Sequence, residues 1–172
     1  MCLGKNGGFF SVGSYNSSYH KKNSSIKTVK MTGKAFYEVK FNKIIVSNNT
    51  STISDGNFII DSGTTISFFP TKIYENILFY ILADCNKNKN CFSNQVTIKN
   101  DVCFLPFQGA SKKDFFGSFS DIDFIDENSN FTYKWKPKDY IAVMIKKGQK
   151  YLCLGFSSHG YYINYKDLTI IC

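Results

Sequence analysis

The chain has 172 residues, enough for one ordinary domain with a buried core. Hydrophobic residues make up 43% of the sequence and aromatic residues 17%, which excludes a chain that is disordered by composition. The net charge of +8 comes from lysine alone, because the sequence contains no arginine. Proteins that read nucleic acids rely on arginine for bidentate and stacking contacts, so we expect no nucleic-acid partner. No apolar run reaches the ~18 residues that a membrane helix needs, so we expect no membrane segment in this chain.

Short apolar runs separated by turn residues predict a mostly β protein. Tyr37, Val39 and Phe41 alternate with polar neighbours, which is typical of a half-buried strand. The expected strands cover residues 9–12, 37–41, 44–46, 58–61, 66–69, 96–98, 102–107, 122–125, 131–135, 140–145 and 151–156. Residues 47–51, 55–56 and 147–149 have the composition of turns.

One main helix is expected after Pro70. We expect Thr71 to be its N-cap. Apolar residues then recur at helical spacing and predict one buried face, and the helix should end near Asp84 and Cys85. The stripe consists of Ile73, Tyr74, Ile77, Leu78, Ile81 and Leu82.

The most informative segment surrounds Asp61, in the sequence Phe-Ile-Ile-Asp-Ser-Gly-Thr-Thr-Ile-Ser-Phe-Phe-Pro of residues 58–70. An apolar strand delivers one carboxylate onto a turn of small residues, and a second apolar run follows. We expect Gly63 to adopt a backbone conformation that other residues cannot. A plain turn would explain Asp-Ser-Gly alone, but the wider pattern favours a catalytic carboxylate. Two such carboxylates that share a proton can activate water and protonate a scissile carbonyl, whereas one is a poor peptide hydrolase.

This segment resembles the second active-site motif of the pepsin family of aspartic proteases. Asp61-Ser62-Gly63-Thr64-Thr65 looks like the motif, and residues 70–74 look like the start of the helix that follows it. Further segments resemble the family in the same order along the chain: residues 2–4, 7–8, 12–13, 36–39, 44–46, 122–124, 135–140 and 153–156. The Trp-Lys-Pro segment at 135–137 and the cysteines look closest to plasmepsin V-like enzymes.

The resemblance implies the C-terminal lobe of the bilobal pepsin-like fold over residues 1–156, followed by a divergent or truncated tail over 157–172. It implies that Asp61 is one of two catalytic aspartates, and that Thr64 bonds across the lobe interface and braces them. It also implies that Gly63, Thr64 and Thr65 contribute to substrate binding, with Phe36 near a side-chain pocket. The expected partners are a polypeptide substrate and an N-terminal lobe that carries the other aspartate. No cofactor and no metal are expected.

Two departures from the family leave the function open. The first lobe, with its own Asp-Thr-Gly motif, is absent from this sequence, and residues 157–165 replace the Ile-Leu-Gly segment of the family. The leading interpretation is an aspartic-type endopeptidase whose chain alone is incomplete for catalysis. The alternatives are a non-catalytic binding protein or pseudo-protease on the same fold, an inactive gene fragment, and a homodimer that pairs two copies of Asp61. The length of the chain speaks against the homodimer.

Six cysteines without Cys-x-x-Cys spacing favour disulfides over a zinc site. The resemblance pairs Cys103 with Cys153, and Cys85 and Cys91 could close the Asn-Lys loop between them. Cys2 and Cys172 remain without an assigned partner. His20 and His159 are expected to be solvated loop residues.

Asp121 and Asp123 alternate with Ile122 and Phe124, which predicts an exposed strand face rather than a calcium site that also uses Asp126 and Glu127. The cysteines and five Asn-x-Ser/Thr sequons indicate a protein of the secretory pathway, either lumenal, vacuolar or secreted. The sequons begin at Asn16, Asn23, Asn48, Asn49 and Asn130. No signal peptide is visible at the N-terminus, so we expect the upstream part of a longer protein.

Overall fold

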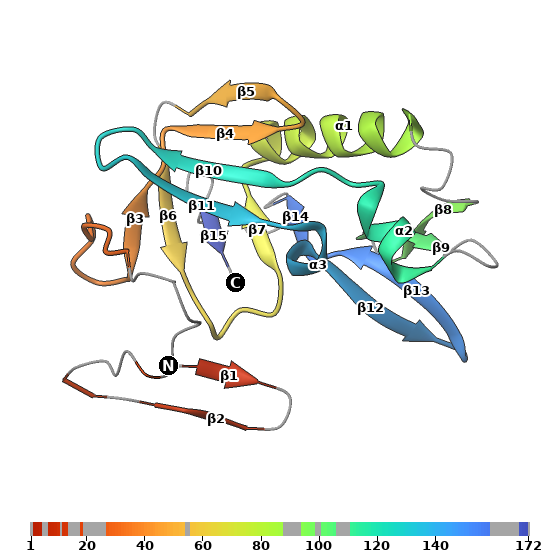
Figure 1. Ribbon diagram of the computed structural model, residues 1–172, viewed down its shortest axis with the longest axis horizontal. Coiled ribbons are helices and arrows are strands. Elements are labelled where there is room, and N and C mark those ends of the chain that lie inside the picture. The colour runs from red at the N-terminus through yellow and green to blue at the C-terminus, as the bar shows by residue number, and fades with distance from the viewer. Residues whose placement is uncertain are drawn as a thin grey trace.

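A computed structural model describes residues 2–4, 7–10, 12–13, 18, 27–53, 56–87, 94–98, 101–105, 111–158 and 169–171. The protein is mostly β with one main helix, as the sequence predicts (Figure 1). The strands are β1 (Cys2–Gly4), β2 (Gly7–Phe9), β3 (Glu38–Lys40), β4 (Lys43–Val46), β5 (Asn49–Thr52), β6 (Asn57–Ile60), β7 (Ser67–Phe69), β8 (Asn94–Ile98), β9 (Asp101–Leu105), β10 (Ile122–Asp126), β11 (Phe131–Trp135), β12 (Ile141–Lys146), β13 (Gln149–Leu154), β14 (Phe156–Ser158) and β15 (Thr169–Ile171). The helices are α1 (Thr71–Lys87), α2 (Lys112–Gly117) and α3 (Pro137–Tyr140).

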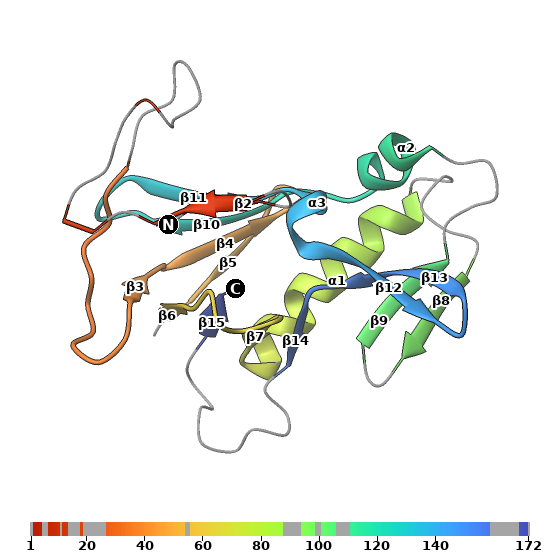
Figure 2. The same cartoon turned by 90° about the horizontal axis from the view of Figure 1, so that it is seen from below.

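Three sheets and one hairpin account for these strands. The first sheet has the order β14-β7-β15-β6-β3, the second β11-β10-β4-β5 and the third β12-β13-β9-β8, while β1 pairs with β2. Strands β6 and β7 run to a common loop, and β15 lies between them (Figure 1). Because β15 pairs parallel to β6 and antiparallel to β7, it joins the two strands that flank Asp61. Seen from below, the third sheet lies at the end of the molecule away from β3 and β6 (Figure 2).

Aromatic side chains fill the core between the first two sheets. Phe124 of β10 is fully buried, and its ring lies 5.8 Å from Phe58 of β6 and 6.0 Å from Phe69 of β7. It also lies 5.0 Å from the Trp135 ring of β11. These centroid separations are those at which aromatic pairs attract each other beyond their buried area. One ring therefore contacts both strands that carry the Asp61 loop and ties them to the second sheet.

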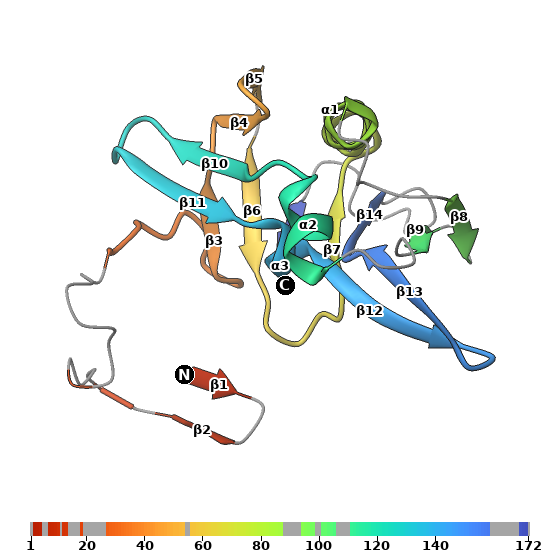
Figure 3. The ribbon, with the colours of Figure 1, turned by 45° about the vertical axis from the view of Figure 1, so that its right-hand side comes forward.

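Helix α1 packs against strands of both sheets, with contacts to β14, β7 and β4. Figure 3 views it nearly along its axis, above β7 and β14. Ile77, Ile81 and Cys85 are buried, so the predicted apolar stripe is confirmed. The prediction that Thr71 is the N-cap is wrong, because Thr71 is already helical and its hydroxyl shares a 3.0 Å hydrogen bond with Ser158.

Other element boundaries also differ from the prediction. The turn expected over residues 47–51 consists only of Ser47 and Asn48, whose φ angles are +52° and +65°, and Asn49 already begins the edge strand β5. Helices α2 and α3 were not predicted. A cap signal marks α2, since Ser111 accepts a 3.1 Å hydrogen bond from the Asp114 backbone N–H. Short elements of this kind form because the surrounding tertiary structure stabilises them.

Replacing the central ring tests its role. We expect Phe124→Ala to lower the free energy of unfolding by about 3–5 kcal/mol, because it removes a fully buried ring and leaves a cavity. Denaturant unfolding would measure the loss. Ile125→Ala, one residue further on the half-buried face of the same strand, is the matched control and should cost clearly less. Equal losses in the two variants would contradict a special role for Phe124.

Candidate active site

The Asp61 loop is anchored at both ends by the core. Phe58 and Ile59 of β6 are buried, and Asp61 follows β6 after Ile60. On the other side, Ser67 and Phe69 of β7 are buried as well. Asp61 itself is only partly buried, so the carboxylate lies at the accessible end of an otherwise buried pair of strands. It is not sealed in the core, so a substrate or a partner group could reach it.

Two neighbouring groups orient the Asp61 carboxylate. The Gly63 backbone N–H donates a 2.8 Å hydrogen bond to Oδ1, and the Thr64 hydroxyl donates to Oδ2. The Thr64 hydroxyl, followed by the Gly63 N–H, lowers the pKa of Asp61 below its ordinary value of 3.8, while partial burial acts weakly in the opposite direction. Asp61 is therefore held ionised and in one orientation at mildly acidic and neutral pH.

Gly63 is needed for a reason other than the predicted one. We expected an unusual backbone, but among the described residues the glycines with left-handed φ are Gly7, Gly13 and Gly148. A Cβ atom on Gly63 would instead lie 3.1 Å from Asp61 Oδ1, which is tighter than ordinary van der Waals contact. The absent side chain thus lets the carboxylate fold back onto the Gly63 N–H.

A cavity of ≈270 Å³ opens beside the loop on the side of Thr65. Trp135, Tyr140 and Ile141 supply much of its apolar lining, and Lys138 and Asp139 add charged groups. The remaining lining residues are Thr65, Ser67, Ala142 and Gly155. Thr65, one of the predicted substrate-binding residues, therefore faces an open space, while Gly63 and Thr64 contact Asp61.

A series of hydrogen bonds connects three of the residues that line this cavity. The Ser67 N–H donates to the Gly155 carbonyl at 2.9 Å, and the Gly155 N–H donates to the Tyr140 carbonyl at 2.7 Å. The Tyr140 hydroxyl then donates to the Ser120 carbonyl at 2.6 Å. Sequence reasoning did not single out Tyr140 as a site residue. These hydrogen bonds link the start of β7 to α3 and so fix one wall of the site.

Exposed apolar side chains lie on the other side of the loop. The Ile60 N–H donates a 3.0 Å hydrogen bond to the Tyr37 carbonyl, which places the segment before β3 beside the end of β6. Phe36, Tyr37 and Ile60 are 52%, 71% and 40% exposed. Phe36, predicted to lie near a side-chain pocket, is thus presented to solvent close to Asp61.

Comparison with protein-family models gives one match, to the eukaryotic aspartyl protease model, over residues 3–160. The chain belongs to the eukaryotic aspartyl protease family. The match includes the whole Asp61 loop and ends before β15. A search of curated proteins finds no match. None of the helices in the described ranges is long and apolar enough to cross a membrane.

One disulfide implied by the family resemblance is confirmed. Cys103 and Cys153 are bonded, and they face each other in the register of β9 and β13. The bond closes a 50-residue separation, worth about 4 kcal/mol in the chain-entropy model. It is compatible with the secreted or lumenal location that is typical of disulfide-bonded members of this family.

The other cysteine and histidine predictions lie largely outside the described residues. Cys85 is buried and disulfide-bonded, but its predicted partner Cys91 is outside the described ranges. The same holds for the Cys2 side chain, Cys172, His20 and His159.

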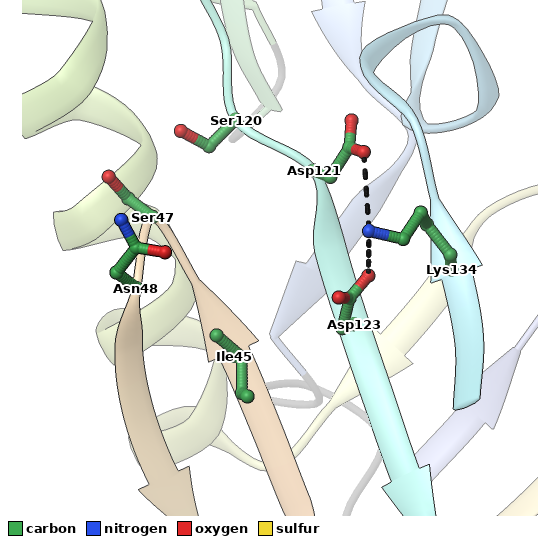
Figure 4. A pocket seen from close by; sticks show the side chains of 7 residues that line it. All are labelled: Ile45, Ser47, Asn48, Ser120, Asp121, Asp123 and Lys134. Atoms are coloured by element: carbon green, nitrogen blue, oxygen red, sulfur yellow. Dashed lines mark ion pairs between the residues drawn. The ribbon is translucent and has the colours of Figure 1, made fainter. Parts of the chain in front are cut away.

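Asp121 and Asp123 lie on an ion-paired face of the aspartyl protease lobe that is half-buried rather than exposed. Lys134 of β11 lies 3.0 Å from Asp123 and 3.5 Å from Asp121, beside a cavity of ≈290 Å³ (Figure 4). The intervening Ile122 is fully buried, so the predicted alternation is confirmed. Sequence reasoning missed Lys134, which becomes a partner only through the pairing of β10 with β11. Within the described ranges, no group of three or more His, Cys, Asp or Glu residues could hold a metal ion.

The role of the Thr64 hydroxyl can be measured directly. We expect Thr64→Val to raise the pKa of Asp61 toward 3.8, because the largest cause of the lowered value is lost. NMR titration of the Asp61 carboxyl carbon measures the change, Thr64→Ser should restore the low value, and Thr65→Val should leave it unchanged. A lowered folded-state pKa stabilises the fold above 3.8, and this contribution disappears as the pH falls through the lowered pKa. An unchanged pKa in Thr64→Val would contradict the assignment.

Deprotonation of Tyr140 at alkaline pH should destabilise the protein. Burial, with the charges of Asp121 and Asp84, raises the pKa of Tyr140 above its ordinary value of 10. Because the folded-state pKa is raised, this stabilisation is present below about pH 10 and is lost as the pH rises further. We expect Tyr140→Phe to cost about 1–2 kcal/mol at neutral pH, since the Ser120 carbonyl loses its donor.

Denaturant unfolding of both proteins at neutral and alkaline pH tests this expectation. The wild-type protein should lose stability above about pH 10, and Tyr140→Phe should lose less over the same interval. Tyr133→Phe, which alters a tyrosine that is 36% exposed, is the control at neutral pH and should change stability little. A Tyr140→Phe variant as stable as the wild type at neutral pH would contradict the role of the hydrogen bond.

Proposed function

We propose that this chain is one lobe of an aspartic-type endopeptidase and that Asp61 is one of its two catalytic aspartates. The observation that carries the proposal is the Asp61 carboxylate, which lies partly exposed between two buried strands and accepts hydrogen bonds on both oxygens. The carboxylate is thus both fixed in orientation and open to a substrate or a partner group. Membership of the aspartyl protease family supports the same assignment.

The proposed chemistry requires a second carboxylate. The pKa of Asp61 is lowered by hydrogen bonds alone, and no carboxylate in the described part of the chain contributes to it. We infer that a second aspartate is supplied from outside this chain, by a first lobe that faces the loop. Asp61 in its ionised form would polarise a water molecule, while the protonated partner would donate a proton to the scissile carbonyl. The two groups would share one proton because like charges at that distance cannot both ionise easily.

The substrate is proposed to be a polypeptide that crosses the Asp61 loop. Gly63, Thr64 and Thr65 would contact its backbone, and the ≈270 Å³ cavity beside Thr65 has room for one of its side chains. Phe36, which is exposed and next to the Tyr37 carbonyl that bonds Ile60, would contact another side chain. Once a first lobe is in place, Thr64 would also bond across the interface. No cofactor takes part in this proposal.

Location and closer kinship are part of the same proposal. The Cys103–Cys153 disulfide supports a protein of the secretory pathway, in a lumen, in a vacuole or outside the cell. The closer likeness to plasmepsin V-like enzymes, based on residues 135–140 and the cysteines, stays a prediction. So does the boundary at residue 156, although β14 and β15 pair with the strands on both sides of the Asp61 loop.

A second candidate is a non-catalytic binding protein on the same fold. It is favoured by the single carboxylate that the described part of the chain presents at the loop. An Asp-Thr-Gly motif encoded upstream in the same transcript would favour the protease, and its absence would favour the binding protein.

A peptide-cleavage assay with a verified monomer tests the need for a partner lobe. We expect the chain alone to cleave no peptide at acidic or neutral pH, because the described part of the chain brings no second carboxylate to Asp61. Adding the upstream lobe should produce cleavage that is lost in Asp61→Ala. Cleavage by the monomer that pepstatin inhibits would contradict the proposal. Cleavage by the chain alone that rises with the square of its concentration would instead indicate a homodimer with two copies of Asp61.

A further inference from the structure

The Asn-x-Ser/Thr sequons are a sequence feature that the proposed peptidase does not use. Three of the five begin at described residues, namely Asn48, Asn49 and Asn130. A sequon marks an acceptor only where the folded protein can hold a bulky glycan outside its surface. The structure therefore allows the three to be compared.

Asn130 lies in an open position. It is exposed, with φ of +51°, and it ends the turn of residues 127–130 that connects β10 to β11. Its side chain makes no hydrogen bond in the described part of the chain. Asn tolerates positive φ better than most residues, so the turn itself explains the backbone but leaves the amide group free.

The rest of this sequon lies at the start of the edge strand β11. Thr132 is exposed, like Asn130, whereas the half-buried Phe131 between them stacks with the ring of Phe41 at 6.3 Å. The apolar residue of the sequon is thus held against the protein, while the two residues that a transferase recognises are accessible. Because β11 is the last strand of its sheet, no further strand covers this edge.

The two overlapping sequons of the β4–β5 hairpin also begin at exposed residues, but both asparagine side chains lie against other groups of the protein. The Asn49 side-chain amide donates a 3.1 Å hydrogen bond to the Ser47 carbonyl. The Asn48 side chain lines the ≈290 Å³ cavity that Asp121 and Lys134 also line, as Figure 4 shows. A glycan on Asn49 would use the same nitrogen that makes this hydrogen bond, and a glycan on Asn48 would leave from this cavity.

We propose that Asn130 is an N-glycosylation site of the folded protein. The acceptor is the Asn130 side-chain amide, and the donor is an oligosaccharide linked to a lipid diphosphate. A bond forms between Asn130 Nδ2 and the first sugar carbon, the bond from that carbon to the phosphate oxygen breaks, and the amide loses one proton as the lipid diphosphate departs. This inference rests on the proposed secretory location, because the donor and the transferase act in that lumen.

A glycan at Asn130 would leave the candidate active site open. The turn between β10 and β11 lies at one edge of the molecule, while the loop between β6 and β7 lies at the bottom (Figures 1 and 3). Modification and peptide binding would therefore use separate surfaces.

Mass spectrometry of the protein purified from its natural source tests the proposal. Peptide N-glycosidase treatment in heavy-oxygen water should convert Asn130, but not Asn48 or Asn49, to labelled aspartate. In tagged copies returned to the same organism, Asn130→Asp and Thr132→Ala should each remove one glycan-sized step on a gel. Aspartate also tolerates positive φ, which preserves the turn, and Thr132→Ala leaves Asn130 in place. Asn49→Asp is the matched control and should keep that step.

The redox state of Cys103 and Cys153 in the same sample separates the two possible failures. If the disulfide is present and Asn130 is unmodified, the glycosylation site is wrong and the secretory location stands. If both thiols are free and no glycan is found, the location and the glycosylation site are wrong together. A glycan on Asn48 or Asn49 in place of Asn130 would also overturn the proposal.

Discussion

The contact of the Phe124 ring with Phe58 and Phe69 is the constraint on which the rest of the structure depends. Phe58 lies in the strand that enters the Asp61 loop and Phe69 in the strand that leaves it, and both rings are fully buried. Strand β15 separates β6 from β7 in the sheet, so the two strands do not hold each other directly. The aromatic core and the pairing of β15 with both strands therefore set the distance between the two ends of the loop together, and with it the position of the carboxylate.

Hydrogen bonds fix the orientation of the Asp61 carboxylate and of the cavity wall, whose strands the core holds in place. Small residues let backbone groups approach closely at two places: Gly63, whose N–H reaches the Asp61 carboxylate, and Gly155, which links Ser67 to the Tyr140 carbonyl. A side chain at Gly155 would lie 3.3 Å from that carbonyl oxygen. Because Tyr140 in turn bonds to the segment before β10, the cavity wall and the Asp61 loop are supported from the same sheet. Disturbing the core should therefore change the site as well as the stability.

The electrostatics of Asp61 favour a role as the ionised member of a pair. Two local donors lower its pKa, and the described part of the chain provides no acid that would raise it. In an assembled enzyme a second carboxylate would oppose this effect, and the balance would decide which aspartate holds the shared proton. In the function proposed above, the lobe would supply one oriented, ionised carboxylate and a partner lobe would supply the other.

The sequence by itself determined the mostly β class, the main helix and the Asp61 motif, because these follow from local patterns of apolar and small residues, while the family and the Cys103–Cys153 bond followed from the resemblance of its segments to aspartic proteases. It did not determine α2, α3, β15, the partnership of Lys134 with Asp121 and Asp123, or the role of Tyr140. The short helices α2 and α3 carry only local cap signals, and β15, the Lys134 ion pairs and the Tyr140 hydrogen bond depend on which strands and segments come together in the folded chain. Gly63 shows the difference most clearly. The motif marked it as special, but only the tertiary structure decided that it is needed for the close approach of the Asp61 carboxylate rather than for its own backbone angle.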